Sequence, residues 1–131
     1  MILIDTNIFL EALLEQDRTP EVRSFFETID LDNSYITDFS LHSIGVILFR
    51  LEKNELFNIF IKDLIQNGMG ILSLKESELL RLNEIAKKFN LDFDDAYQYV
   101  CAKSYKLELV SFDGDFDRTD IQRKEPFKLL K

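Results

Sequence analysis

Three aspartates that lie far apart along the chain carry the strongest chemical signal. Asp5 follows a short apolar run, Asp95 lies at the start of a helical stretch, and Asp113 follows another apolar run. Carboxylates that crowd together raise one another's pKa unless a cation compensates them. Their oxygens suit Mg²⁺ or Mn²⁺. We therefore expect these aspartates to hold a divalent ion, with Asp115 either an extra carboxylate ligand or a solvated turn residue.

Each aspartate also has an ordinary structural explanation. Asp5 can cap the first helix, and Asp113 followed by Gly114 can form a turn. Asp95 can be a first-turn acid favoured by the helix dipole, and it stands at capping-box spacing from Asp92. The three are more telling together than singly if the fold brings them to one place. The chain has one histidine and one cysteine, which argues against a zinc site built from such ligands.

Alternating apolar runs and helical patterns predict the elements that must position these side chains. Strands are expected at 2–4, 34–36, 71–74, 107–112 and 127–130, and helices at about 6–15, 20–29, 38–53, 55–66, 76–89 and 93–105. In the first helix Glu11 and Glu15 are expected on the solvent side. The alternation predicts a three-layer α/β/α domain with a short, mainly parallel sheet. Ligands bind such sheets beyond the carboxyl ends of the strands, where Asp5 and Asp113 are expected.

Size and composition favour one folded α/β domain over residues 1–131. Hydrophobic residues make up 46% of the chain and phenylalanine occurs 12 times, so a well-packed core is expected. The chain shows neither an apolar run long enough to cross a membrane nor a basic leader, so we expect a cytoplasmic protein without a membrane partner. Cys101 lies in an apolar helical stretch and is interpreted as core filler.

The charge of the chain is unusual for a protein that acts on a polyanion. The formal net charge is −8, whereas nucleic-acid affinity comes largely from lysine and arginine. Metal ions can offset clustered acids, and an uneven charge distribution can leave a basic surface. The stretch 118–131 is locally basic through Arg118, Arg123, Lys124, Lys128 and Lys131.

Three short motifs, in order, resemble those of a known family. They are Ile-Asp-Thr-Asn at 4–7, Asp-Ala at 95–96 and Ser-Phe-Asp-Gly-Asp-Phe at 111–116. Together they resemble the PIN domains, which include toxin ribonucleases of the VapC type and related lone archaeal and bacterial proteins. The resemblance spans nearly the whole chain, although each motif alone is weakly specific. It implies a PIN-like fold and metal-dependent cleavage of RNA.

The resemblance also implies roles for individual residues. Asp5 would be a central metal ligand, and Asp95 and Asp113 would be the later metal-binding acids. The supporting positions would be Thr6 and Asn7, which organise the pocket by hydrogen bonds, Ser111 as a pocket hydroxyl and Phe116 as a packing residue.

One position departs from the family pattern. PIN domains usually carry a glutamate in the first turns of the helix after the second strand, and here Ser43 or His42 occupies that place. Asp38 lies more than a turn earlier and substitutes only if the helix starts differently. His42 could move protons beside a metal site, or be a hydrogen-bonded, partly buried helix residue. A missing carboxylate would weaken the metal site.

Three functions remain open from the sequence. The first is a Mg²⁺- or Mn²⁺-dependent endoribonuclease, with the toxin of a toxin–antitoxin pair as one form of it. The second is a catalytically impaired PIN-like module that binds RNA or protein. The third, a phospho-acceptor receiver domain, fits poorly because paired acids after the first strand are lacking. The apolar helical stretches at 44–51 and 57–64 indicate a homodimer surface or an antitoxin-binding groove, or simply core packing.

Overall fold

The computed structural model describes residues 1–129, in which helices are layered around a four-stranded parallel sheet. The strands are β1 (Ile2–Ile4), β2 (Ser34–Thr37), β3 (Gly70–Leu72) and β4 (Glu108–Val110). Their order is β3-β2-β1-β4, and every pairing is parallel. The predicted α/β/α fold class is confirmed.

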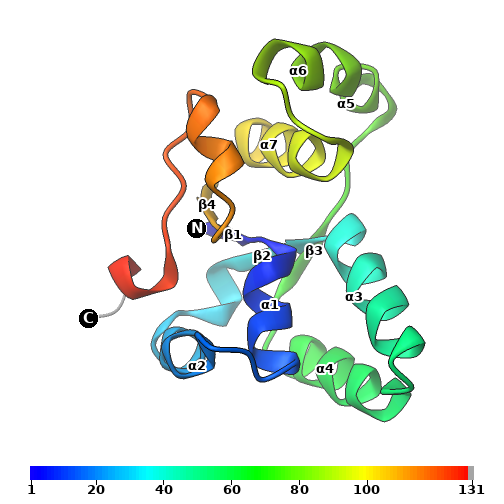
Figure 1. The fold of residues 1–131 in the computed structure, drawn as a ribbon, viewed down its shortest axis with the longest axis vertical. Helices are drawn as coiled ribbons and strands as arrows, with labels where there is room; N and C mark the ends of the chain where they lie inside the picture. The colour runs from blue at the N-terminus through cyan, green and yellow to red at the C-terminus, as the bar shows by residue number, and fades with distance from the viewer. Residues whose placement is uncertain (130–131) are drawn as a thin grey trace.

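Helices cover both faces of this sheet (Figure 1). One face carries α1 (Thr6–Leu13), α2 (Thr19–Thr28), α3 (Asp38–Arg50) and α4 (Asn54–Gln66). The other carries α5 (Glu76–Leu79), α6 (Leu82–Phe89) and α7 (Phe93–Tyr105). Short 3₁₀ helices, η1 (Leu31–Asn33), η2 (Gly114–Arg118) and η3 (Pro126–Leu129), complete the chain.

Alternation along the strands divides the core into two halves. Leu3 and Leu109 pack with α6 and α7, whereas Ile4 and Val110 pack with α1 to α4. Phe116 and Cys101 are fully buried in the α7 half, as expected of a packing residue and a core filler. Burial also raises the pKa of the Cys101 thiol to about 12, which makes it a poor nucleophile at neutral pH.

Several element boundaries differ from the sequence prediction. Helix α3 ends at Arg50 because Glu52 adopts a left-handed conformation, and the backbone N–H of Lys53 then bonds to the carbonyl of Leu48. The predicted helix 76–89 is divided into α5 and α6 by a tight turn in which the N–H of Arg81 bonds to the carbonyl of Glu78.

The predicted strand 107–112 is limited to Glu108–Val110, because the N–H of Ser111 pairs with the carbonyl of Lys124 instead. The predicted strand 127–130 is wrong over the part the structure describes, where Pro126–Leu129 form η3, and Leu130 lies outside the described residues. Glu11, expected on the solvent side, is only 8% exposed; its carboxylate accepts the N–H of Arg18 at 3.1 Å as the chain turns back after α1.

Within residues 1–129, no helix is both long and apolar enough to span a bilayer.

Candidate metal centre

The carboxyl ends of the parallel strands bring the predicted acids to one edge of the sheet. Asp5 follows β1 directly and caps α1, its Oδ1 accepting the N–H of Thr6 at 2.8 Å. Asp113 follows β4 by two residues and caps η2, its Oδ1 accepting the N–H of Asp115 at 2.8 Å. Asp95 lies in the first turn of α7, which Asp92 caps. The ordinary capping roles are therefore present, and they also aim these acids at a shared edge.

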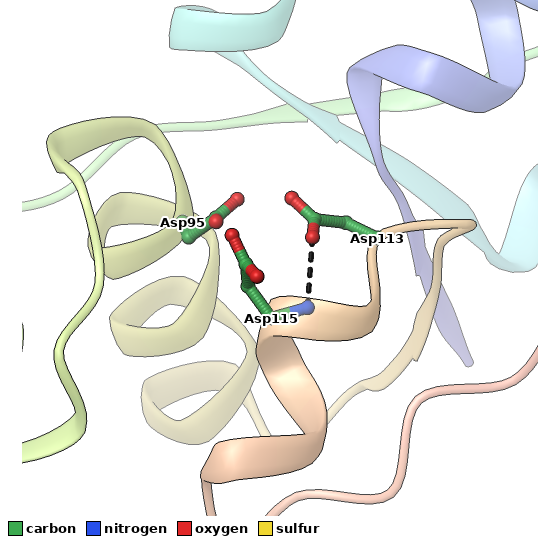
Figure 2. Close-up of side chains that lie close together, drawn as sticks. All are labelled: Asp95, Asp113 and Asp115. Carbon is green, nitrogen blue, oxygen red and sulfur yellow. Dashed lines mark hydrogen bonds between the residues drawn. The ribbon is translucent and has the colours of Figure 1, made fainter.

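Three of the acids converge into a cluster (Figure 2). Asp95, Asp113 and Asp115 each offer one carboxylate oxygen, and these oxygens all lie within 4.8 Å of one another. Asp95 comes from α7, whereas Asp113 and Asp115 come from η2 and the loop before it. Two segments that are remote in sequence thus build one acidic pocket.

Asp95 is the most perturbed group of the cluster. Its side chain is only 5% exposed, and its Oδ2 has no hydrogen-bond partner among residues 1–129. Burial, and then the adjacent Asp113 carboxyl, raise the pKa of Asp95 to about 8. A buried carboxylate oxygen without a partner is costly, and it points to a missing ligand.

Asp5 lies beside this cluster in a different environment. Its Oδ2 accepts the hydroxyl of Ser111 at 2.7 Å and the amide of Asn7 at 3.5 Å. Burial raises the pKa of Asp5, while the bonds from Ser111, Gln98 and Thr6 act in the opposite direction. The negative charge of Asp113 raises the pKa of Asp5 too, which links Asp5 electrostatically to the cluster.

Ser111 and Asn7 connect Asp5 to the loop that carries Asp113. The Ser111 hydroxyl oxygen accepts the backbone N–H of Asp113 at 3.0 Å and the Asn7 amide at 3.3 Å. The side-chain oxygen of Asn7, Oδ1, in turn accepts the backbone N–H of Phe112 at 3.2 Å. These bonds join the first and last motifs to each other.

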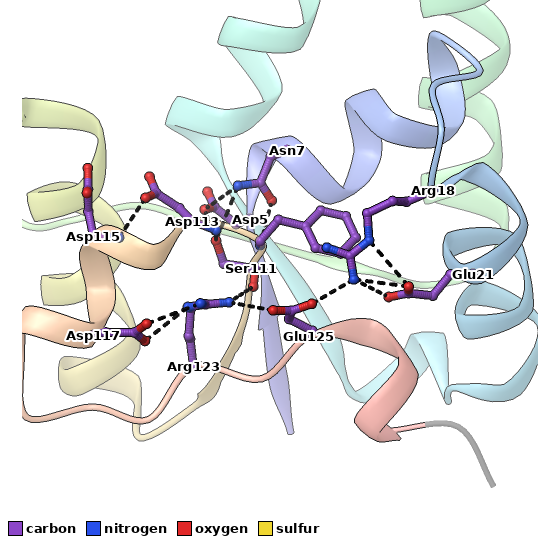
Figure 3. A network of polar contacts seen from close by, with 11 residues as sticks. Asp5, Asn7, Arg18, Glu21, Ser111, Asp113, Asp115, Asp117, Arg123 and Glu125 are labelled. Carbon is purple, nitrogen blue, oxygen red and sulfur yellow. Dashed lines mark hydrogen bonds and ion pairs between the residues drawn. The ribbon is translucent and has the colours of Figure 1, made fainter.

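An ion-pair network supports the same loop from outside (Figure 3). Arg18 lies 3.8 Å from the ring centre of Phe112 and pairs with Glu125 at 2.6 Å. Arg123 pairs with Glu125 at 3.2 Å and donates to the carbonyl of Ser111, also at 3.2 Å. The network holds the C-terminal segment against the end of β4 and so stiffens the loop that leads to Asp113.

The basic character of the C-terminal stretch is largely neutralised in the fold. Three of its cations form ion pairs within the chain, namely Arg118 with Asp115, Arg123 with Asp117 and Lys124 with Glu108. Lys131 lies outside the described residues. Most of the cations that the structure describes in the predicted basic tail are therefore paired with acids of the chain itself.

The donor set fits a hard divalent cation. Every side chain in the cluster offers a carboxylate oxygen, and Oδ2 of Asp95 has no hydrogen-bond partner within residues 1–129. Mg²⁺ and Mn²⁺ prefer such ligands and retain several waters. Asp95, Asp113 and Asp115 are therefore the residues that could hold the ion, with Asp5 next to them.

A family model described as "PIN domain" matches residues 2–122. The chain belongs to the PIN domain family. The match confirms the resemblance drawn from the three motifs. No curated protein sequence matches the chain significantly.

Solved structures of bacterial proteins share this PIN fold. VapC20 of Mycobacterium tuberculosis, a sarcin–ricin loop cleaving toxin, has a TM-score of 0.81 at 14% identity and covers 96% of this chain and 100% of its own. FitAcB of Neisseria gonorrhoeae has a TM-score of 0.73 at 21% identity, and the match covers 98% of this chain and 100% of the FitAcB chain. A toxin–antitoxin complex of Klebsiella pneumoniae has a TM-score of 0.70 at 19% identity, and the match covers 88% of this chain and 90% of the matched chain. At these identities the likeness establishes the fold.

The position that usually carries a glutamate in PIN domains has no acid in this structure. His42 is exposed on α3, so the alternative of a partly buried residue is wrong, and no hydrogen bond joins it to the acids within residues 1–129. Ser43 is half-buried one turn after Ser40. Asp38 is occupied elsewhere, because it accepts the hydroxyl of Tyr97 at 2.6 Å and the N–H of Phe39 at 2.8 Å.

Two buried polar residues beside Asp5 were not predicted from the sequence. Gln98 is 1% exposed and donates to Asp5 Oδ1 at 2.8 Å, and Ser40 is fully buried and accepts the Thr6 hydroxyl at 2.7 Å. A signal for Gln98 was present, because it interrupts the apolar inner face of α7 one turn after Asp95. Ser40 carried no comparable signal.

Proposed function

We propose that this PIN protein is a Mg²⁺- or Mn²⁺-dependent endoribonuclease. The observation that supports it most is the convergence of the Asp95, Asp113 and Asp115 carboxylates, in which Asp95 also has a buried Oδ2 without a hydrogen-bond partner within residues 1–129. When bound, a divalent ion would lower the pKa of a coordinated water and stabilise charge on the phosphate oxygens. Asp95, Asp113, Asp115 and Asp5 are the proposed ligands.

The chain's own residues have a positioning task in this mechanism. Ser111 bonds to the Asp5 carboxylate and to the backbone N–H of Asp113, and Asn7 bonds to Ser111. These bonds keep Asp5 and Asp113 at a fixed separation. Asp92 fixes the first turn of α7 and thereby Asp95. Such preorganisation reduces the cost of gathering like charges when the cation and the phosphate arrive.

The proposed substrate is RNA, and the proposed setting is the bacterial type of toxin–antitoxin pair. VapC20 is named as a toxin that cleaves the sarcin–ricin loop, and the Klebsiella structure is a toxin–antitoxin complex. With an RNA substrate, we expect the protein to act in the cytoplasm. An antitoxin would find an apolar groove of about 270 Å³ between α1, α2 and α4. Its lining includes Phe9, Leu13, Phe26, Phe60, Leu64 and Met69.

We also propose a homodimer through α3 and α4. Val46, Phe49 and Ile59 are each about half exposed on these helices, at 48%, 53% and 55%. Exposed apolar side chains on two consecutive helices favour association. Sedimentation equilibrium of the protein and of a Phe49→Ser variant tests the proposal, since a dimer through this face should weaken in the variant.

A catalytically impaired PIN module is the second candidate, and the acid-free position on α3 favours it. Asp38 bonds to Tyr97, Ser43 is neutral and His42 faces solvent, so none supplies the carboxylate that PIN domains usually place there. Such a module would bind RNA or a protein partner without cutting.

One experiment separates the two candidates. Labelled RNA is incubated with Mn²⁺ and the wild type, Asp95→Asn or Asp94→Asn. Asp94 lies exposed in the same helical turn, so its variant makes the same charge change outside the cluster. The nuclease proposal expects cleavage by the wild type and Asp94→Asn alone. RNA binding without cleavage by the wild type would favour the impaired module.

A further inference from the structure

Gln98 stands at the centre of a buried polar cluster between α7, β2 and α3. The side chain is 1% exposed, and Thr37 and Ser40 next to it are fully buried. The Gln98 carbonyl oxygen accepts the Thr37 hydroxyl at 2.9 Å. Its amide nitrogen donates to Asp5 Oδ1 and to the Ser40 hydroxyl oxygen, both at 2.8 Å. An ionised carboxylate only accepts hydrogen bonds, so the amide nitrogen faces Asp5 and the carbonyl oxygen is left to accept the Thr37 hydroxyl.

The surrounding hydroxyls leave this amide little freedom. Thr37 Oγ1 also accepts the backbone N–H of Ser40 at 3.0 Å and lies 3.1 Å from its hydroxyl. The Ser40 hydroxyl oxygen accepts the Thr6 hydroxyl at 2.7 Å. Every polar atom of the Gln98 side chain therefore has a partner, and rotating the amide would break several buried bonds.

This cluster determines the orientation of Asp5. Oδ1 of Asp5 accepts two bonds, one from the Thr6 N–H and one from Gln98. Oδ2 accepts the Ser111 hydroxyl, which also binds the backbone of Asp113. With Oδ1 committed to protein donors on one side, Oδ2 is the oxygen kept on the side of the Asp113 loop.

We propose that Gln98 is a positioning residue for the metal centre, which orients the Asp5 carboxylate through its amide donor with Thr37 and Ser40 as support. The inference rests on the proposed metal-dependent function. A neutral amide and hydroxyls thus surround Asp5 on the side of α3, where PIN domains usually place an acid. Removing a residue that orients a metal ligand typically lowers metal affinity about 10- to 100-fold.

Gln98→Met tests the proposal because it keeps the length of the side chain and removes its donor. Mn²⁺ affinity of the full chain is measured from the electron paramagnetic resonance signal of the free ion, and folding is checked by urea denaturation in EDTA. The expected loss of affinity is about tenfold or more. Tyr99→Phe is the matched control, because Tyr99 is also buried on α7 but bonds to Asp120, away from Asp5. Its affinity should stay within about twofold of the wild type.

A double-mutant cycle shows whether Gln98 acts through Asp5. Asp5→Asn keeps the three clustered carboxylates, so residual Mn²⁺ binding is expected to be measurable. In that background Gln98→Met should change affinity by less than about twofold. An equal loss in both backgrounds, or wild-type affinity in the single variant, would overturn the role of Gln98.

Two further outcomes are covered by the same design. If the wild type binds no Mn²⁺, the metal centre and the role of Gln98 both fall; if only Gln98→Met is without effect, the metal centre stands. Should Gln98→Met fail to fold, Ser40→Ala replaces it, because it removes a partner of the amide. Its expected loss is about threefold, and an affinity equal to that of Tyr99→Phe would overturn the proposal.

Discussion

Replacing Asp95 with asparagine should stabilise the metal-free protein while removing its metal affinity. In the folded protein the pKa of Asp95 is raised from its usual value of 3.8 to about 8, through burial and the adjacent Asp113. The folded state therefore retains a proton that the unfolded chain releases, so stability falls as pH rises from about 4 to about 8. Asparagine is a neutral copy of the protonated acid and avoids this loss.

The size of the effect follows from the interval between the two pKa values. At about 1.4 kcal/mol per pH unit, the roughly three pH units between the usual value and pH 7 set a ceiling of about 4 kcal/mol. Asp113, whose carboxyl contributes to the shift, is partly exposed, so solvent screens part of the repulsion. We expect Asp95→Asn to be more stable than the wild type by about 2 kcal/mol at pH 7 and nearly equal to it at about pH 4.

Urea denaturation in EDTA at about pH 4, 5.5 and 7 measures this difference, with Asp94→Asn as the control. Saturating Mn²⁺ should then stabilise the wild type, by about 2.7 kcal/mol at roughly 100 times the dissociation constant, but not Asp95→Asn. A variant that is less stable than the wild type at neutral pH, or a difference that does not change with pH, would refute the explanation of the unpartnered oxygen. Equal stabilisation of both proteins by Mn²⁺ would refute the assignment of Asp95 as a ligand.

Other substitutions test the same geometry. Asp5→Asn and Asp113→Asn should each abolish Mn²⁺-dependent RNA cleavage and keep the circular dichroism spectrum of the fold; turnover like that of the wild type would contradict their roles. Ser43→Glu should strengthen Mn²⁺ binding by supplying the acid that α3 lacks, and calorimetry that shows unchanged or weaker affinity would remove this prediction. Glu11→Ala should lower the free energy of unfolding by about 1 to 3 kcal/mol, because it leaves the N–H of Arg18 without its acceptor; a loss below about 0.5 kcal/mol in urea denaturation would show that water replaces the carboxylate.

Much of the fold could be predicted because its strands are short apolar runs and its helices are amphipathic. The order β1 to β4 and the helices between them follow from those patterns, and parallel pairing follows from the crossovers. The ends of the helices and strands were harder to predict, since they depend on hydrogen-bond partners elsewhere in the chain. Strand β4 ends where the backbone N–H of Ser111 bonds to the carbonyl of Lys124, and no local sequence pattern encodes that pairing.

The acids of the site could be found in the sequence because parallel strands end at a common edge. Asp113 caps η2 and accepts the N–H of Asp115 in its first turn, which keeps these two acids close together. The meeting with Asp95 depends on how α7 packs over β4; the α/β topology favoured it, and the family motif added to that prediction. For Glu11 the sequence prediction was wrong. Its position in the helical pattern predicted exposure to solvent, but the loop after α1 folds back over it and buries it.

The surroundings of Asp5 could not be predicted, and the reason is physical. A buried carboxylate needs donors, but a sequence does not state which segments will supply them, and Thr6, Gln98 and Ser111 come from three separate segments. Only Ser111 and Thr6 lie within recognisable motifs. Gln98 reaches Asp5 and Ser40 bonds to the Gln98 amide because α3 and α7 meet at the same end of the sheet, so their roles are set by the packing of two helices. A polar residue that interrupts the apolar face of a helix one turn from a predicted ligand is therefore a useful signal, since burial of such a side chain requires a polar partner.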